Sequence, residues 1–101
     1  MSEIISKHEA QPGRAWWVYI LLCEDNAYYV GLTHDLDRRW QEHLTGRGGH
    51  YTRTNRPVRM AFAEPHPTRA AAERRERQLK GWTRRKKEAL IAGDMQALKR
   101  S

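Results

Sequence analysis

The sequence predicts a small α/β domain of the α+β type, in which a three-stranded, mainly antiparallel sheet is flanked by three helices. Two apolar, β-favouring segments, 16–23 and 27–32, are separated by the turn residues 24–26. A third segment, 57–64, alternates apolar and polar residues and is closed by prolines. Helical spacing of apolar residues recurs in three other segments, each preceded by a Thr or Asp that can act as N-cap.

The length of the first turn determines which side chains share a face of the hairpin. Side chains alternate faces along a strand, so Tyr19 and Tyr29 point to one side only if the turn holds an odd number of residues. A three-residue turn, with Asn26 at a positive φ, pairs Tyr19 with Gly31. We therefore predict that both phenols lie on one face, with the glycine leaving space beside Tyr19.

The first helix is predicted over 36–44, with Arg39 and His43 one turn apart at the edge of its apolar stripe. A loop is predicted over 46–56, because this segment begins with glycines and is too polar for a core strand. The two later helices, each starting at a threonine cap, are predicted over 68–82 and 83–93.

The composition fits one folded domain. The chain has 101 residues, 39% of them hydrophobic, and the folded part is predicted over 15–93, between a flexible N-terminal arm (1–14) and a short basic tail (94–101). Cys23 is the single cysteine, which excludes an intrachain disulfide or a cysteine metal site. No apolar segment has the length of a membrane span and no signal peptide is evident, so we expect a cytoplasmic protein.

The net charge of +7 is concentrated in the last third of the chain. Residues 1–68 contain eight basic and eight acidic side chains, whereas residues 69–101 contain eleven basic and four acidic ones. This imbalance favours a nucleic-acid partner over an anionic membrane, since the basic segment lacks a matching run of large apolar residues. A solvated helix surface explains the charge alone equally well.

Glu76 interrupts an otherwise apolar pattern. It falls inside the stripe formed by Ala72, Leu79 and Trp82 on the second predicted helix. An inward carboxylate costs roughly several kcal/mol unless it is paired or bound to a metal. The sequence pattern allows two ways to satisfy this carboxylate: a salt bridge, with Arg39 as a candidate partner, or binding of a divalent cation.

Five polar residues are expected near one face of the sheet. Each of them taken singly has an ordinary structural explanation. Together they supply what phosphodiester hydrolysis needs, namely a group that takes a proton from water, a cation and a carboxylate for a metal ion. These residues are Tyr19, Tyr29, Arg39, His43 and Glu76.

The spacing of these residues resembles that of the GIY-YIG nuclease family, over about residues 15–90. The likeness is greatest to its small single-domain bacterial branch, which is similar to the nuclease module of structure-selective endonucleases. Trp17 replaces the glycine of the first signature, and Leu32 stands where the family has a lysine. The corresponding segments are Trp17-Val18-Tyr19, Tyr29-Val30-Gly31, 35–43 and 76–80.

This resemblance implies a metal-dependent DNA endonuclease that acts in DNA repair or on branched DNA. Tyr19 would be the general base or would orient the attacking water, and Tyr29 would help to position water and phosphate. Arg39 would stabilise the transition state, and His43 would assist in proton transfer or contact the phosphate. Glu76 would bind one Mg²⁺ or Mn²⁺, which suits a largely hydrated ion.

Further cations are expected to bind the nucleic acid, and target selection is expected to depend on DNA shape, a partner protein or a homodimer. One alternative is a non-catalytic nucleic-acid-binding module of the same fold. Another is a docking domain whose basic helices bind an acidic protein. The expected nucleic-acid-binding residues are Arg38, Arg53, Arg56, Lys80, Arg84 and Arg85, and in the module also Lys86 and Lys87.

Overall fold

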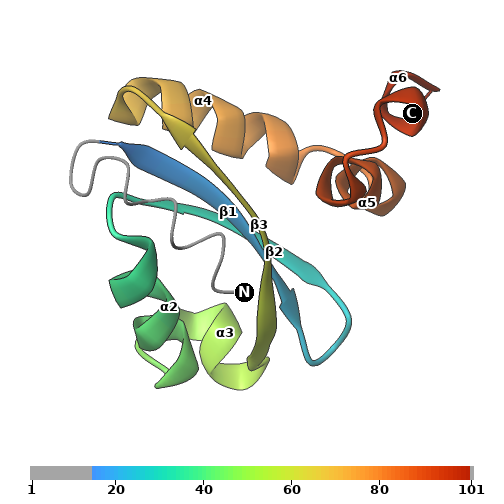
Figure 1. The fold of residues 1–101 in the computed structure, drawn as a ribbon. Helices are drawn as coiled ribbons and strands as arrows, with labels where there is room; N and C mark the ends of the chain where they lie inside the picture. The colour runs from blue at the N-terminus through green and yellow to red at the C-terminus, as the bar shows by residue number, and fades with distance from the viewer. Residues whose placement is uncertain (1–14, 101) are drawn as a thin grey trace.

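The computed structural model describes residues 15–100, so the arm predicted at 1–14 lies outside the described residues. The described chain forms an antiparallel sheet of strand order β2-β1-β3 with helices on both faces (Figure 1). This confirms the predicted α+β fold and its three strands, the third of which is two residues longer than predicted. The strands are β1 (Trp16–Cys23), β2 (Tyr28–Thr33) and β3 (Pro57–His66).

The first hairpin has the predicted register. Asn26 has a φ of 68°, and the backbone N–H of Cys23 donates to the carbonyl of Ala27 at 3.0 Å. Tyr19 pairs with Gly31 across the two strands. The odd turn therefore places the side chains of Tyr19 and Tyr29 on the same face of the sheet.

Five helices are present among the described residues, where three were predicted. The predicted caps Thr68 and Thr83 are formed, since the side chain of each accepts a backbone N–H at the start of its helix. Thr33 and Asp35 were both candidate caps for the first helix, and Asp35 is the one that caps it. The prediction of a loop over 46–56 was wrong where α3 forms. This helix is too short for its apolar residues to show a helical period. A short helix, α6, also follows Gly93. The helices are α2 (Leu36–Leu44), α3 (His50–Thr54), α4 (Arg69–Lys80), α5 (Arg84–Ala92) and α6 (Met95–Arg100).

The sheet separates two apolar clusters. On one face Val18 and Ile20 pack with Leu79 of α4 and with side chains of α5. On the other face Tyr19 and Leu36 belong to a cluster beneath α2 and α3. Figure 1 shows α4 on one side of the sheet and α2 and α3 on the other. Within residues 15–100, no helix is long and apolar enough to cross a membrane.

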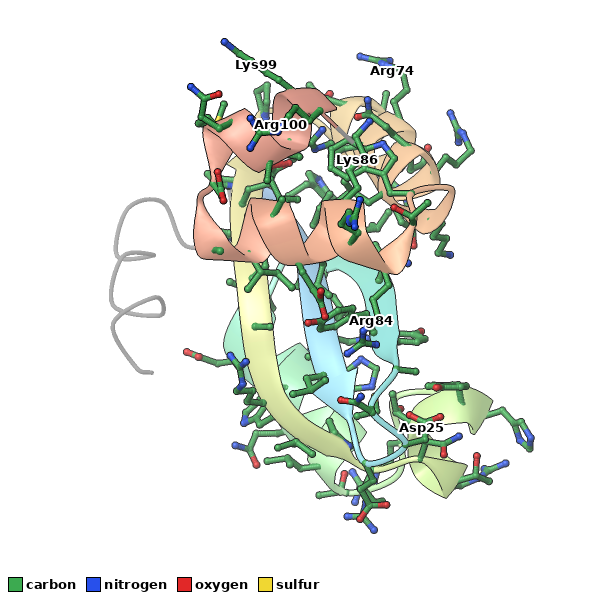
Figure 2. All side chains as sticks on the ribbon, turned by 90° about the vertical axis from the view of Figure 1, so that its right-hand side faces the viewer. Asp25, Arg74, Arg84, Lys86, Lys99 and Arg100 are labelled. Atoms are coloured by element: carbon green, nitrogen blue, oxygen red, sulfur yellow. The ribbon has the colours of Figure 1, made fainter. Side chains whose placement is uncertain are left out.

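The charge imbalance of the sequence becomes a difference between these layers. The eleven basic and four acidic side chains of residues 69–100 all belong to α4, α5, α6 and the turns between them. We call these elements the basic layer. Figure 2 shows Arg74, Lys86, Lys99 and Arg100 gathered on this layer, with Asp25 at the far end of the hairpin. One side of the domain thus carries its whole excess of positive charge.

Candidate active site

A cleft of about 430 Å³ lies beside β2, the strand at one edge of the sheet. Its walls come from both layers, because residues of α2 and α4 line it together with Gly31 and Leu32 of β2. Four of the five predicted catalytic residues line this cleft: Tyr19, Tyr29, Arg39 and Glu76.

Tyr19 reaches the cleft across the backbone of β2. The side chain is 1% exposed, and a Cβ atom placed on Gly31 would lie 2.5 Å from the phenolic oxygen. Glycine is therefore needed at this strand position to let the phenol pass. The predicted space beside Tyr19 is present and is filled by the ring itself.

The phenolic oxygen of Tyr19 has two partners on α2. It accepts a hydrogen bond from Nε of Arg39 at 3.3 Å and lies 2.9 Å from Nε2 of His43. Burial raises the pKa of Tyr19 to about 12, although the hydrogen bond from Arg39 opposes this effect. Tyr19 is therefore a neutral phenol at pH 7 in the protein alone.

His43 lies behind Tyr19 rather than in the cleft. Its side chain is fully buried, and its Nδ1 is 2.7 Å from Oγ1 of Thr52. Burial and then the charge of Arg39 lower the pKa of His43 to about 4, so the imidazole is neutral at pH 7. The predicted direct contact of His43 with phosphate does not fit this burial, whereas an interaction through Tyr19 does.

Arg39 is fixed by three acceptors. Besides Tyr19, its guanidinium donates to Oε1 of Glu42 at 2.8 Å and to the carbonyl of Gly48 at 2.9 Å. Although burial opposes the charge, the hydrogen bonds to Tyr19 and Glu42 raise the pKa of Arg39, which stays charged. The suggested salt bridge between Arg39 and Glu76 was wrong, because Glu42 takes that place one turn along the same helix.

Glu76 faces the cleft from α4. Its side chain is only 20% exposed and Oε2 is 3.2 Å from Nζ of Lys80, whose side chain is 56% exposed. Among residues 15–100, no three His, Cys, Asp or Glu side chains are grouped so that they could hold a metal ion. A half-buried carboxylate paired with an exposed lysine fits a hydrated Mg²⁺ that uses few protein ligands and completes its shell with water or phosphate oxygens.

Helix α3, which was not predicted from the sequence, contributes side chains that contact Tyr29 and His43. Tyr51 of α3 stacks on Tyr29, with ring centroids 5.8 Å apart and planes inclined by 11°. Its hydroxyl donates to Oδ2 of Asp25 at 2.6 Å. Thr52, the next residue, is the partner of His43. An aromatic residue beside a threonine in a polar segment was the only sequence signal for this support.

The predicted nucleic-acid-binding residues do not form one surface. Arg38, Arg53 and Arg56 come from the α2–α3 side, and Arg56 donates to the carbonyl of Leu44. Arg84 stacks over the ring of Tyr28 at 4.5 Å. Lys80, Arg84 and Arg85 belong to the basic layer.

Three charged residues of α4 that sequence reasoning missed line the cleft: Arg69, Glu73 and Arg77. Arg69 donates to Glu73 at 2.8 Å. Helical spacing from Glu76 could have found Arg69 and Glu73, because residues seven and three positions away share its face of the helix.

Comparison with known proteins identifies the family and confirms the fold of the chain. The family model of the GIY-YIG catalytic domain matches residues 15–89. A UPF0213 protein of Xanthomonas axonopodis pv. citri is 47% identical over 78 residues, which cover 77% of this chain and 76% of that protein. A UPF0213 protein of Haloquadratum walsbyi is 45% identical over 74 residues, covering 73% and 83%. The solution NMR structure of a UPF0213 protein from Bacillus halodurans is similar, with a TM-score of 0.52, 40% identity, and 79% and 85% of the two chains covered.

Proposed function

Because the chain belongs to the GIY-YIG catalytic domain family, we propose that it is a metal-dependent endonuclease that hydrolyses phosphodiester bonds in DNA. The observation that carries this proposal is the cleft beside β2. There the phenols of Tyr19 and Tyr29, the guanidinium of Arg39 and the carboxylate of Glu76 face one space. A phosphate group in that space would meet a cation, an oxygen ligand for a metal ion and a phenolic oxygen for the attacking water.

Each of the five predicted catalytic residues has a separate task in this proposal. Tyr19 takes a proton from the attacking water or orients it, and Tyr29 holds the water and phosphate in place. Arg39 compensates the negative charge that develops on the phosphate oxygens. Glu76 would hold Mg²⁺ or Mn²⁺, which when bound supplies charge neutralisation at the same oxygens. His43 acts through its hydrogen bond with Tyr19, from outside the cleft.

The basic layer supports a nucleic-acid substrate. Arg69 and Arg77 extend this layer into the cleft from α4, so a strand lying there would pass from the outer helices to the reacting residues. We propose branched or damaged DNA as the target, through the likeness to structure-selective endonucleases. Target selection would then rest on DNA shape, a partner protein or a second copy of the chain.

A second candidate is a nucleic-acid-binding module of the same fold that does not cleave. One observation favours it: Nζ of Lys80 is already paired with the carboxylate of Glu76. If this ion pair persists with DNA bound, a metal ion has to compete with a tethered ammonium group for the same oxygen.

The two functions are separated by incubating supercoiled plasmid and branched DNA with the protein in Mg²⁺ and then in EDTA. Nicking that disappears in EDTA, in Arg39→Ala and in Glu76→Gln supports the endonuclease. Glu88→Gln is the matched control, since Glu88 is an exposed acid on α5 that pairs with Arg84. Binding of DNA, measured by fluorescence anisotropy, without product from the wild type under any condition supports the module and overturns the endonuclease.

A further inference from the structure

The helix α3 has one fully buried side chain, and that side chain is the hydroxyl partner of His43. Thr52 is 0% exposed, although its neighbours Tyr51 and Arg53 are not buried. Its Oγ1 lies 2.7 Å from Nδ1 of His43, whose Nε2 lies 2.9 Å from the oxygen of Tyr19. A continuous chain of hydrogen bonds therefore leads from α3 to the phenol in the cleft.

The direction of this chain follows from which groups can donate. Among residues 15–100, Nδ1 of His43 is the acceptor available to the buried hydroxyl of Thr52. A buried hydroxyl proton without an acceptor is costly, so Thr52 donates to Nδ1. A neutral imidazole that accepts at Nδ1 carries its proton on Nε2 and donates from there to the oxygen of Tyr19.

The oxygen of Tyr19 then receives two donors. The guanidinium of Arg39 can only donate, and it does so from Nε at 3.3 Å. With Nε2–H of His43 as the second donor, the proton of Tyr19 itself points into the cleft that Tyr19 lines, where a water molecule can accept it. Two donors to an oxygen favour its ionised form over its neutral form.

We propose that Thr52 is a positioning residue of the site, which holds His43 as a hydrogen-bond donor so that Tyr19 can act as the general base. This inference rests on the proposed endonuclease function and selects one of the two roles considered for Tyr19. Accepting a hydrogen bond at Nδ1 also polarises the ring and strengthens the donor at Nε2.

The proton movements balance without an outside redox partner. The phenol first releases its proton to solvent through the cleft. The resulting phenolate takes one proton from the attacking water while the water oxygen bonds to phosphorus and the bond to the leaving oxygen breaks. The leaving oxygen takes a proton from solvent, and the proton that Tyr19 took from the water restores the neutral phenol of the starting state. The other titratable or charged groups that act on Tyr19 are Arg39 and His43 from α2, Tyr29 from β2 and Glu76 from α4.

The tautomer can be measured on the free protein, independently of cleavage. We expect long-range ¹H–¹⁵N spectra at pH 7 to show His43 protonated at Nε2, with Nδ1 as a hydrogen-bonded acceptor, and His43→Gln to assign its signals. A proton on Nδ1 of His43 overturns the inference. This result does not depend on whether DNA is cleaved.

The catalytic consequence is tested with Thr52→Val, which keeps the shape but removes the hydroxyl. We expect kcat for nicking to fall about 10-fold or more with KM unchanged, and the rising limb of the rate–pH profile to move up by about one pH unit. Thr52→Ser, which keeps the donor, should recover activity to within about threefold.

The outcomes distinguish this inference from the proposed function. If the wild type cleaves but Thr52→Val cleaves at the same rate with the same pH profile, the inference is wrong and the endonuclease stands. If the wild type cleaves no DNA, the proposed function is wrong whatever the tautomer. Should Thr52→Val and Thr52→Ser lose activity equally while both stay folded, the hydroxyl has only a packing role and the inference is again wrong.

Discussion

The phenol of Tyr19 fills the space that a side chain at Gly31 would need: a Cβ atom on Gly31 would lie 2.5 Å from the phenolic oxygen of Tyr19. The two residues are direct partners in the β1–β2 hairpin, so this close approach is set by the register of the strands. The access of the phenol to the cleft therefore depends on a missing side chain in the neighbouring strand.

Gly31→Ala is expected to displace the ring of Tyr19, because overpacking a closed site costs about 1–3 kcal/mol. Nicking should be lost and the midpoint of urea unfolding should fall. Gly81→Ala is the control, since the nearest atom to its Cβ would be the carbonyl oxygen of Gln78 at 3.6 Å. Equal stability of the two variants would contradict the overlap seen at Gly31.

Tyr19→Phe removes the phenolic oxygen and keeps the ring. We expect nicking to fall by about 10²-fold to 10⁴-fold, the range typical of a lost acid–base group. Tyr28→Phe, on the opposite face of the same hairpin, should cleave like the wild type. Rates are measured by conversion of supercoiled to nicked plasmid. A Tyr19→Phe protein that cleaves normally would remove this residue from the chemistry.

The stability of the fold should depend on pH through His43. Its pKa is lowered from 6.5 to about 4, so between these values the unfolded chain binds a proton that the folded chain does not. The free energy of unfolding is therefore highest above about pH 6.5. It falls by about 3 kcal/mol in total as the pH decreases to about 4.

Urea unfolding at several pH values between 7 and 4 measures this dependence. The slope of stability against pH should be smaller in His43→Gln than in the wild type. His50→Gln, at an exposed position on α3, should keep the slope of the wild type. An unchanged slope in His43→Gln would show that other groups cause the pH dependence.

Binding of DNA should depend on salt through the basic layer. Each phosphate contact contributes about 0.9 to the slope of log K against log salt. We therefore expect Arg74→Ala and Arg85→Ala each to lower this slope by about one. Arg47→Ala, an exposed arginine in the loop after α2, should leave it unchanged. Equal effects of all three substitutions would argue against a binding surface confined to the basic layer.

Local patterns were enough to predict the hairpin. The parity of the turn fixed the register of Tyr19 and Gly31, because it depends only on the alternation of side chains along two strands. The N-caps Asp35, Thr68 and Thr83 could also be predicted from the sequence, since an N-cap bonds to a backbone N–H two or three residues away. The family resemblance rested on the same local spacing.

The pairing of charged side chains could not be predicted in this way. Arg39 was considered as a partner of Glu76 but binds Glu42, and Glu76 pairs with Lys80. Both observed partners lie within one helical turn, where the side chain needs no long-range arrangement to reach them. The sequence contains several cations near Glu76, and helical spacing alone does not say which of them forms the ion pair.

The sequence by itself determined the strands, the three longer helices, their caps and the presence of two phenols on one face, since each depends on residues close along the chain. Tertiary structure alone decided that α3 forms, that Thr52 meets His43, and that the cleft opens at the edge of β2. The reason is that a five-residue helix has little stability of its own and exists here through what it packs against. The contact between Thr52 and His43 follows from that packing.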